Sequence, residues 1–586
     1  MLKRRRTVDI ATPTYHSEVV PSIGASLHAT KRLGEILMEQ GAVGTADFEQ
    51  ALEEQVRVGG KIGTTLVRRG VITSRALTEA LSAQFGIPIL DVRLERAMPE
   101  ALALIEESIA RLLVVVPMST DGTTARVAVA DPLDDRLQEL LSGLAVSRVN
   151  VVLADADDIR TTLNDSYKAL STVDEQIRQF EASVPLPPPQ TDARQAFAEA
   201  DAPIVNVVDG IVSQALRDRA SDVHIEPTDG RLRVRFRIDG ALTEVLSLPS
   251  SMANALVSRI KIMADMNIVE RRRPQDGQFQ ATVDGRDVDV RVATTSTIWG
   301  EKAVLRLLDK SRSLLPLAQL GMPASTYDVY SKIVHQPYGM IICSGPTGSG
   351  KTTTLYATLA EISRTELNVM TIEDPVEYVF PQINQTQINI QADVTFAVGL
   401  RSILRQDPDI ILVGEIRDAE TARIAVQSAL TGHVVMSSLH ATDSASALFR
   451  LLDMGIEPFL VSSAVVGVVA QRLVRRICPS CTVEYTPSES DLAWYAHVFG
   501  PPKARFVHGT GCNYCANLGY RERIGVYEVL EVTDEIRHLV TTGASPRDVR
   551  RLAVDQGMSS LGNAAAQLVH RDLTTIDECI RNVYVP

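Results

Sequence analysis

The chain has 586 residues, of which 45% are hydrophobic and 22% are charged, and its formal net charge is -13. This length exceeds what one hydrophobic core supports, so three or more soluble domains are expected. The acidic balance argues against a dedicated nucleic-acid-binding protein, and six cysteines in so long a chain do not make a disulfide framework.

The N-terminal segment is expected to be a flexible tail, residues 1–27. Its basic start is not followed by the apolar region of a secretory signal. No apolar run reaches the ~20 residues that a bilayer crossing needs. The longest such run, residues 459–470, is interpreted as a buried helix. We therefore expect a cytoplasmic chain with no direct membrane span.

Residues 32–55 and 61–84 form an internal repeat with an offset of 29 residues. The apolar spacing in each copy predicts a short helix, a turn marked by glycine and a second amphipathic helix. The repeat is either a duplicated helical hairpin that only packs together, or a duplicated anion site. In the second case a cation and the N–H groups of a helix start would bind phosphates. The candidate residues are Arg32, Leu33, Gly34, Lys61, Ile62 and Gly63.

The two copies resemble the N-terminal domain of MshE-type pilus ATPases, which binds cyclic di-GMP. The resemblance implies such a domain over residues 28–170, with cyclic di-GMP as its ligand. Two positions depart from the family pattern, because Lys61 stands in place of Arg and Phe48 in place of Leu. A lysine cannot make the bidentate contact of an arginine. Further on, residues 112–117 and 125–130 are interpreted as a βαβ-like stretch.

A Pro-rich segment, residues 184–189, predicts an extended linker over residues 171–200. A small α+β domain is expected after it, over residues 201–312. Within this domain, residues 232–238 alternate apolar side chains with arginines, which predicts a strand. Residues 288–292 show the same alternation.

The predicted strand places Arg233, Arg235 and Arg237 on one face. Like charges on one strand face are mildly unfavourable, so an anionic partner is one interpretation. The other is a solvated face near the acidic residues Asp229, Asp239 and Glu244.

The strongest local signal is a glycine-rich loop between a predicted strand, residues 339–344, and a predicted helix, residues 353–360. This context identifies a P-loop, whose backbone N–H groups and helix N-terminus bind nucleotide phosphates. We expect Lys351 to reach the β- and γ-phosphate oxygens of ATP, and Thr352 to ligate Mg²⁺. The candidate nucleotide-binding residues are Gly345, Pro346, Thr347, Gly348, Ser349, Gly350, Lys351, Thr352 and Thr353.

Hydrolysis also needs acidic and polar groups near the phosphates, and three predicted strand ends supply them. Apolar runs end at Glu373, at Glu415 and at His440. Because open α/β sheets bind ligands at the carboxyl ends of their strands, these side chains are expected beside the P-loop. We assign Glu415 as the water-activating base and Glu373 as a helper on metal or water, with the reverse assignment open. A structural hydrogen-bonding role is the alternative for His440.

These segments resemble the type II secretion and type IV pilus assembly ATPase family over roughly residues 200–586. The matching motifs are its Walker A motif (345–352), Asp box (373–375), Walker B motif (413–418), His box (431–442) and two motifs of its preceding domain (221–226 and 274–277). The resemblance implies a homo-hexameric ring with ATP between a RecA-like domain and the smaller domain before it. Arginines of the smaller domain would complete the site. Which arginine reaches the γ-phosphate is left open among Arg235, Arg237, Arg273 and Arg291.

Two Cys-x-x-Cys pairs predict a metal site. Cys478, Cys481, Cys512 and Cys515 provide four thiolates, which suit tetrahedral Zn²⁺. The 30 residues between the pairs indicate an inserted subdomain, and the zinc is expected to be structural. Redox-active dithiols or inert thiols are the alternatives. The same ATPase family carries a similar four-cysteine module, and its retraction motors generally lack it, which favours an assembly or export motor.

The predicted fold is multidomain α/β. A RecA-like P-loop ATPase core is preceded by a small α+β, PAS-like domain and by an N-terminal helical-repeat plus α/β domain, and a zinc subdomain is inserted near the C-terminus. The expected order is flexible tail (1–27), MshE-type N-terminal domain (28–170), Pro-rich linker (171–200), small α+β domain (201–312), RecA-like ATPase domain (313–477), zinc-binding subdomain (478–516) and C-terminal helical domain (517–586).

The predicted function is a hexameric cytoplasmic ATPase that powers type II protein secretion or type IV pilus assembly and responds to cyclic di-GMP. The resemblance implies association with the inner membrane through platform and adaptor proteins, and no nucleic-acid partner is expected. One alternative is a DNA-translocating or conjugative ring ATPase. Another is a second-messenger receptor whose ATPase activity is its output.

Overall fold

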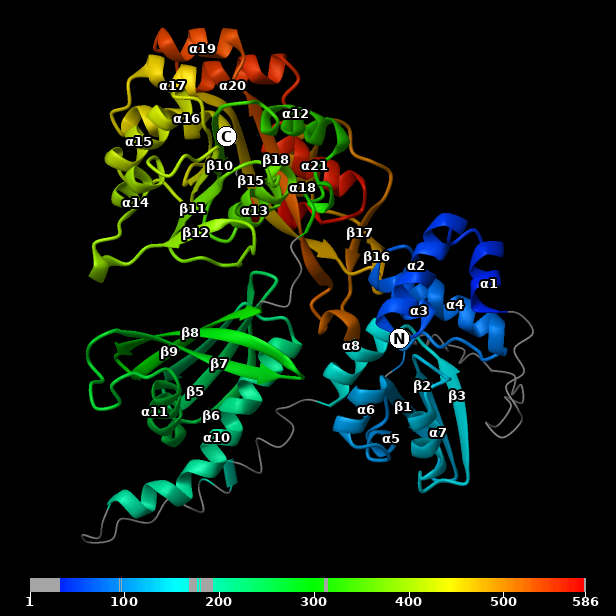
Figure 1. Ribbon diagram of the computed structural model, residues 1–586. Coiled ribbons are helices and arrows are strands. Elements are labelled where there is room, and N and C mark those ends of the chain that lie inside the picture. Colours follow the sequence, from blue (N-terminus) through cyan, green and yellow to red (C-terminus); the bar gives the residue numbers. More distant parts are fainter. Residues whose placement is uncertain are drawn as a thin grey trace, which may run out of the picture. The chain divides into compact units, whose positions relative to one another are not determined.

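The computed structural model describes residues 32–93, 95, 97–167, 177–178, 180, 193–309 and 315–583 (Figure 1). The chain divides into two compact units, Met1–Lys168 and Ala169–Pro586. The expected tail at residues 1–27 and the Pro-rich segment at residues 184–189 lie outside the described residues. In the part of the chain that is described, no helix combines the length and the apolar character that a bilayer crossing requires.

The first unit begins with four helices that recur at an interval of 29 residues. They are α1 (Leu33–Glu39), α2 (Thr45–Val58), α3 (Ile62–Arg68) and α4 (Ser74–Phe85). A Cβ atom on Gly34 would lie 2.3 Å from a ring carbon of Phe48, and one on Gly63 would lie 2.6 Å from a methyl group of Leu77. These are equivalent positions of the two copies. Each glycine therefore permits the two helices of its copy to pack closely.

A small α/β part follows in the same unit. Its elements are α5 (Pro99–Leu102), α6 (Glu107–Leu113), β1 (Val115–Thr120), β2 (Thr124–Val129), α7 (Asp135–Ser142), β3 (Arg148–Leu153) and α8 (Ala156–Ser166). β1 and β2 pair antiparallel, whereas β2 and β3 pair parallel. The βαβ-like interpretation of residues 112–130 is therefore wrong, because the three residues between β1 and β2 are too few for a crossover. The βαβ unit is β2–α7–β3.

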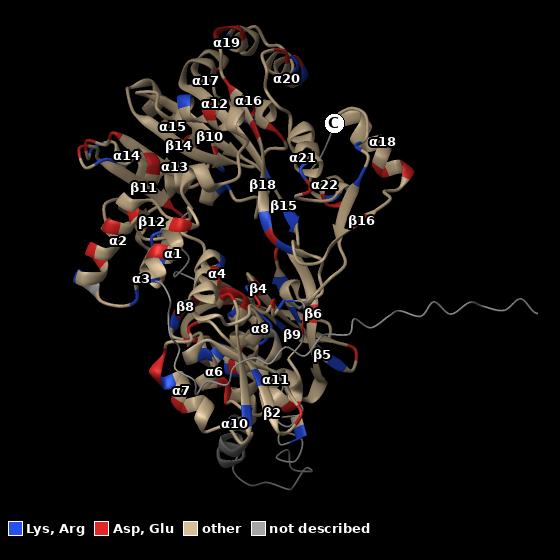
Figure 2. Cartoon of the chain, turned by 90° about the vertical axis from the view of Figure 1, so that its right-hand side faces the viewer, with Lys and Arg blue, Asp and Glu red and all other residues tan. Residues whose placement is uncertain are grey.

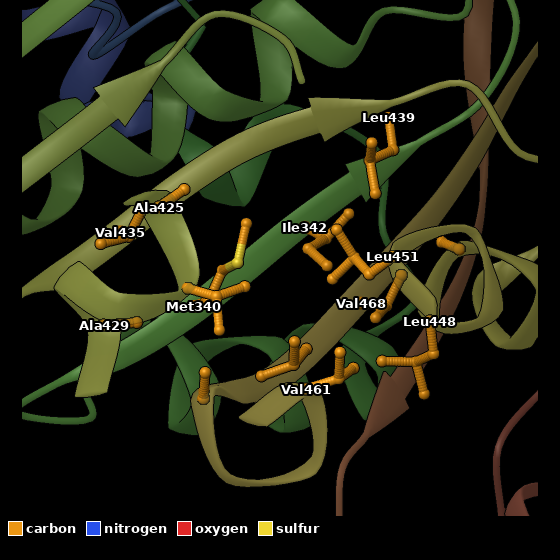
Figure 3. Close-up of a cluster of buried hydrophobic side chains, with 14 of the residues drawn as sticks. Met340, Ile342, Ala425, Ala429, Val435, Leu439, Leu448, Leu451, Val461 and Val468 are labelled. Carbon is orange, nitrogen blue, oxygen red and sulfur yellow. The ribbon is translucent and has the colours of Figure 1, made fainter. Parts of the chain in front are cut away.

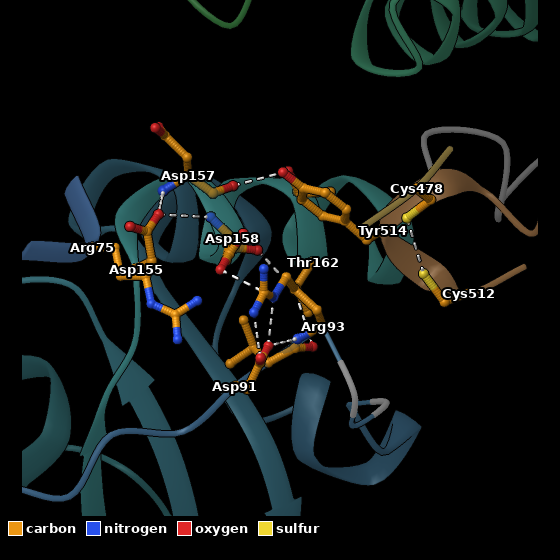
Figure 4. A network of polar contacts seen from close by, with 12 residues as sticks. Arg75, Asp91, Arg93, Asp155, Asp157, Asp158, Thr162, Cys478, Cys512 and Tyr514 are labelled. Carbon is orange, nitrogen blue, oxygen red and sulfur yellow. Dashed lines mark hydrogen bonds and ion pairs between the residues drawn. The ribbon is translucent and has the colours of Figure 1, made fainter. Parts of the chain in front are cut away.

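An arginine network joins the segment before α5 to α8 (Figure 4). Arg93 forms a two-pronged ion pair with Asp91, in which Nε donates to Oδ1 at 2.7 Å. Its Nε also lies 3.5 Å from Oδ2 of Asp158 on α8. The hydrogen bonds from Arg93 hold the pKa of Asp91 below its ordinary value. Thr162 of α8 donates to the carbonyl of Asp158 at 2.9 Å.

The second unit contains a six-stranded antiparallel sheet in the order β6-β5-β4-β9-β8-β7. Its elements are α10 (Ala193–Arg217), β4 (Asp222–Thr228), β5 (Arg231–Ile238), β6 (Ala241–Pro249), α11 (Ala253–Met263), β7 (Gln275–Val283), β8 (Arg286–Thr297) and β9 (Gly300–Asp309). The two alternating patterns are thus confirmed as strands. One face packs on α10 and α11 through Leu232, Val234 and Phe236, which are fully buried. α10 begins at Ala193, inside the expected linker, because its first turns are rich in good helix formers.

A seven-stranded sheet forms the rest of this unit, in the order β12-β11-β13-β14-β10-β15-β18. Its strands are β10 (Gly339–Ser344), β11 (Val369–Glu373), β12 (Asn384–Gln387), β13 (Ile410–Val413), β14 (Val434–Leu439), β15 (Val465–Ile477) and β18 (Tyr520–Glu531). All neighbours pair parallel except β15 and β18. The helices on and around it are α12 (Ala324–Val334), α13 (Lys351–Ile362), α14 (Phe396–Ile403), α15 (Ala419–Leu430), α16 (Ser444–Asp453), α17 (Pro458–Ala464), α18 (Glu489–Val498), α19 (Asp534–Thr541), α20 (Pro546–Asp555), α21 (Leu561–His570) and α22 (Ile576–Asn582).

Two expectations for this region are corrected. Residues 459–470 are not one buried helix, because α17 ends at Ala464 and β15 begins at Val465. A run of apolar residues that is buried on both sides fits either structure, and its β-branched part pairs with β10. Residues 517–586 are not only helical, because β18 pairs with β15 at the edge of the ATPase sheet. β16 (Thr482–Tyr485) and β17 (Phe506–Gly509) form a separate two-stranded sheet between them in sequence.

The strand that leads into the P-loop is buried on both faces. On one face, Met340 and Ile342 pack with side chains of β14, α16 and β15, among them Val435, Leu448 and Val468 (Figure 3). On the other face, Ile341 and Cys343 belong to a second cluster that includes α13. Every residue of β10 is buried. The position of the P-loop is thus set by close packing on both sides.

A buried carboxylate ties two helices to β18. Glu528 is 2% exposed, and its oxygens accept the backbone N–H of Ser444 at 2.9 Å and of Leu561 at 3.0 Å. These residues begin α16 and α21. A negative charge is favourable at a helix N-terminus, so one carboxylate stabilises both helix starts.

Replacing Glu528 by Gln is expected to lower the free energy of unfolding by about 2–3 kcal/mol, since the two helix starts lose charge-assisted hydrogen bonds. The thermal midpoint of the purified full chain measures this effect. Glu531→Gln, at an exposed position of the same strand, is the control and should leave the midpoint unchanged. Equal midpoints for the two variants would contradict the assigned role of Glu528.

Candidate active site

The glycine-rich loop joins the buried strand β10 to α13, so the predicted strand–loop–helix context is confirmed. Gly348 and Gly350 have φ angles of 75° and 90°, which residues other than glycine rarely adopt. Gly350 is also crowded, because a Cβ atom there would lie 2.7 Å from Nε2 of Gln471. The Oγ atom of Ser349 is buried without a hydrogen-bond partner among the described residues. The loop thus presents backbone N–H groups and a free hydroxyl at the start of a helix, which suits phosphate binding.

Lys351 is the first residue of α13 and turns back over the loop. Its Nζ atom donates to the carbonyl oxygens of Gly345 and Pro346, both at 2.9 Å. Burial lowers the pKa of Lys351, while the negative charge of Glu415 opposes this shift. The ammonium group therefore lies in the loop, within the electrostatic reach of the predicted base.

Three predicted site residues follow three neighbouring parallel strands. Glu373 ends β11, Glu415 follows β13 by two residues, and His440 directly follows β14. β14 is the strand beside β10, so all of them and the P-loop lie at the same edge of the sheet. The Nε2 atom of His440 lies 3.7 Å from Oε2 of Glu415, and Glu415 also pairs with Arg417. The His440 side chain is 53% exposed and that of Glu415 is 17% exposed, so both are accessible to a substrate.

Glu373 has a different environment from Glu415. It is 3% exposed, and three donors bind its carboxylate. Tyr356 of α13 donates to Oε2, while Thr371 at 2.6 Å and Gln385 at 3.2 Å donate to Oε1. Three donors fix this carboxylate in orientation, whereas the Glu415 carboxylate lies beside Arg417 and His440 and its side chain is 17% exposed. Which of the two glutamates acts as the base stays a prediction.

Two supporting residues were missed by the sequence analysis. Gln471 and Arg472 lie on β15, the strand next to β10, and both are close to glycines of the P-loop. Oε1 of Gln471 accepts the hydroxyl of Thr354 at 2.7 Å, and Arg472 donates to the carbonyl of Thr442 at 2.5 Å. A Cβ atom on Gly345 would lie 3.2 Å from Nη1 of Arg472. A buried polar pair directly after the apolar run at residues 459–470 was the available signal, and it was missed because that run was interpreted as a helix.

Strands β4, β5 and β9 of the six-stranded sheet contain charged residues of both signs (Figure 2). Arg235 makes a two-pronged contact with Glu226, at 2.8 and 3.0 Å. Burial by itself raises the pKa of Glu226, but hydrogen bonds from Arg235 and Lys302 outweigh this effect and lower it to about 2. Arg237 lies 3.7 Å from Asp222. The predicted arginine face thus contains its own anions.

The other two candidate arginines lie on β8 and just before β7. Arg291 of β8 lies 3.7 Å from Glu377, which follows the Asp box, and Arg273 is exposed. An open pocket of about 520 Å³ lies on this sheet face and is lined by Asp222, Asp276, Gly277, Gln278, Arg291, Val292, Ala293, Val304 and Arg306.

The four predicted metal ligands lie together. The sulfur atoms of Cys478, Cys481, Cys512 and Cys515 are all within 4.8 Å of one another, and Cys478 lies 3.8 Å from Cys512 (Figure 4). Zinc–sulfur bonds of ~2.3 Å in a tetrahedron give sulfur–sulfur distances of about 3.8 Å. Backbone N–H groups of Gly511 and Gly519 point at Cys481 and Cys515 at 3.3 and 3.2 Å, which would stabilise thiolates. These residues fit Zn²⁺.

The predicted phosphate-binding residues of the repeat lie at two equivalent helix starts. Arg32 immediately precedes α1, and Lys61 immediately precedes α3. Nζ of Lys61 lies 2.5 Å from Oδ2 of Asp131, with the Lys61 side chain 50% exposed. Gly34 and Gly63 contact side chains of the following helices, which supports the packing interpretation for these two positions. Leu33 and Ile62 pack partly buried in the helical core.

Comparison with known proteins gives consistent matches. The Type II/IV secretion system protein family matches residues 197–581, and the MshEN domain matches residues 85–172, after the repeat. A type IV pilus assembly ATPase PilB of Myxococcus xanthus is 39% identical over 559 residues, which are 94% of this chain and 98% of that protein. A type II secretion system protein E of Pseudomonas aeruginosa is 47% identical over 384 residues, 65% of this chain and 76% of that protein. The ATPase DotB of Legionella pneumophila is 20% identical, covers 64% of this chain and 94% of its own, and gives a TM-score of 0.48.

The purified chain is expected to contain one zinc ion per molecule, measured by elemental analysis after growth in zinc-containing medium. The double variant Cys512→Ser/Cys515→Ser should lose the ion and its thermal midpoint should fall, because the two loops lose their link. Cys579→Ser replaces a buried cysteine outside the cluster and should keep the zinc. Full zinc content in the double variant would contradict the assigned site.

Proposed function

The chain belongs to the Type II/IV secretion system protein family, and its relatives include a pilus assembly ATPase and a type II secretion protein. On this premise we propose how its residues hydrolyse ATP and which process the hydrolysis drives. The protein is an ATPase that powers type II secretion or type IV pilus assembly. The observation that carries the proposed site is the common edge at which Glu373, Glu415 and His440 follow the strands beside the P-loop. The DNA-translocating alternative is set aside, because the relatives are pilus and type II secretion proteins.

In the proposed site, Lys351 and the loop N–H groups bind the β- and γ-phosphates. Thr352 would hold Mg²⁺, which would neutralise charge on the phosphates during transfer. Glu415 accepts a proton from the attacking water, and His440 orients Glu415 or the γ-phosphate from the next strand. Support for this division comes from exposure: the Glu415 side chain is 17% exposed, whereas Glu373 is 3% exposed. Glu373 then acts as a fixed negative charge near the metal.

The working assembly is proposed to be a homo-hexamer, in which the small domain supplies arginines to the nucleotide. Arg235 and Arg237 are the first candidates, with Arg273 and Arg291 as further ones. An incoming triphosphate has to compete with Glu226 for Arg235 and with Asp222 for Arg237. The motor is proposed to lie in the cytoplasm and to reach the inner membrane through platform and adaptor proteins. The zinc site would hold the Cys478 and Cys512 loops together as a structural element.

We also propose that the N-terminal repeat binds cyclic di-GMP and so regulates the motor. The MshEN match supports a domain of this type, although it begins at residue 85. Arg32 and Lys61 would each contact one phosphate group from equivalent helix starts. Ligand binding at Lys61 would replace an exposed ion pair with Asp131, which costs about 0–1 kcal/mol.

Glu415→Gln is expected to keep ATP binding and to lower the turnover rate by about 10²-fold or more, because the amide cannot accept a proton. Lys351→Ala should lose binding and turnover together. Steady-state phosphate release and binding of a fluorescent ATP analogue separate these effects. Glu420→Gln, at an exposed position on α15, is the control. Wild-type turnover in Glu415→Gln would remove Glu415 from the role of base.

Arg32→Ala is expected to weaken cyclic di-GMP binding by the full chain at least tenfold, since it removes a charge-assisted phosphate contact. Lys61→Arg should tighten binding, because an arginine adds bidentate geometry. Titration calorimetry measures both effects, and Arg160→Ala on α8 is the control. No heat at high cyclic di-GMP concentration with the unmodified chain would leave packing as the only role of the repeat.

A further inference from the structure

One buried hydroxyl group joins the P-loop helix to the carboxylate at the end of β11. Tyr356 lies in α13, one helical turn after Thr352, and its side chain is fully buried. Its hydroxyl donates to Oε2 of Glu373 and accepts the backbone N–H of Glu377 at 3.2 Å. The Tyr356 hydroxyl thus contacts both ends of residues 373–377, the segment that contains the Asp box.

The ring of Tyr356 is fixed by the loop that follows this segment. It makes edge contacts with Phe380 and Tyr378, with ring centres 5.3 and 6.0 Å away. Burial, together with the bond to Glu373, raises the pKa of Tyr356, so its hydroxyl remains a donor at neutral pH. The donor is therefore fixed in place and permanently protonated.

The three donors to Glu373 come from different parts of the fold. Thr371 lies on β11 itself, and Gln385 lies on the neighbouring strand β12. Tyr356 is the donor that belongs to the helix carrying Lys351 and Thr352. It also holds the oxygen that the other two leave open. Without the Tyr356 hydroxyl, the Glu373 carboxylate would accept hydrogen bonds only at Oε1, and Oε2 would lose its hydrogen bond to the P-loop helix.

We propose that Tyr356 is a positioning residue for ATP hydrolysis, which holds the Glu373 carboxylate in a fixed orientation relative to Lys351 and Thr352. This inference rests on the proposed function, because it takes Glu373 as part of the hydrolytic site. Its physical basis is the rigidity of α13: the phosphate-binding lysine and the tyrosine hydroxyl move as one body. The separation between the P-loop and the Asp box, three strands away in the sheet, is bridged by this side chain.

The test is Tyr356→Phe in the full chain, with Tyr330→Phe as the matched control. Tyr330 is also fully buried, and its hydroxyl bonds to Thr358 of the same helix at 2.7 Å, away from Glu373. Each variant removes one buried hydroxyl: that of Tyr356 reaches from α13 to Glu373, and that of Tyr330 reaches from α12 to α13. We expect kcat to fall roughly tenfold or more in Tyr356→Phe, with the Kd for ATP within about twofold of the unmodified chain. Tyr330→Phe should keep kcat and show a comparable change in thermal midpoint.

A second variant makes the result independent of the folding of the first. Thr371→Val removes another donor to Glu373 with almost no change in volume, and should lower kcat in the same way. An unchanged kcat in Tyr356→Phe, or a fall in kcat that only accompanies lost ATP binding, would overturn the proposal. So would an unchanged kcat in Thr371→Val if Tyr356→Phe does not fold. An inactive unmodified chain would instead contradict the proposed function itself.

Discussion

Four neighbouring parallel strands, β11, β13, β14 and β10, end at the same edge of one sheet, and the chemistry of the site depends on this arrangement. Parallel pairing requires long connections, so residues that are far apart in sequence arrive side by side. Backbone contacts fix the ends closely: Gly345 donates to the carbonyl of Leu439 at 3.2 Å, and Gly414 to that of Ile372 at 2.8 Å. A Cβ atom on Gly414 would lie 3.3 Å from the Cα of Glu373, which is a tight contact.

In the small domain, charged groups on one sheet face are paired with opposite charges, so like charges do not repel one another unopposed. The Glu226 carboxylate forms ion pairs with Arg233, Arg235 and Lys302. Because its pKa is lowered, it is ionised at neutral pH. These pairs lie on the face opposite the apolar core, so the alternation in β5 separates packing from charge. Arg235 is the most firmly held candidate arginine. The looser contact of Arg291 with Glu377 can be exchanged for phosphate at lower cost.

Local patterns predicted those parts of the site whose chemistry lies in consecutive residues. The P-loop, the strand ends at Glu373 and Glu415, and the four clustered cysteines each lie on a short motif with a physical reason for its spacing. Features that depend on how strands and helices pair in space could not be predicted from the sequence. The change from α17 to β15 at Val465 occurs inside one apolar run, and only pairing with β10 distinguishes the two parts. The contribution of Gln471 and Arg472 depends on that strand, and the bond from Tyr356 to Glu373 depends on how α13 lies over β11.

The N-terminal repeat shows that the packing and ligand-binding interpretations concern different atoms. Gly34 and Gly63 are explained by the side chains of Phe48 and Leu77 against them, and they need no ligand. The cations beside them are not explained by packing, because Arg32 is exposed and Lys61 is half exposed. An exposed ion pair such as Lys61–Asp131 contributes little to stability and is readily exchanged. Close helix packing therefore accounts for the two glycines, and phosphate binding by Arg32 and Lys61 stays a prediction.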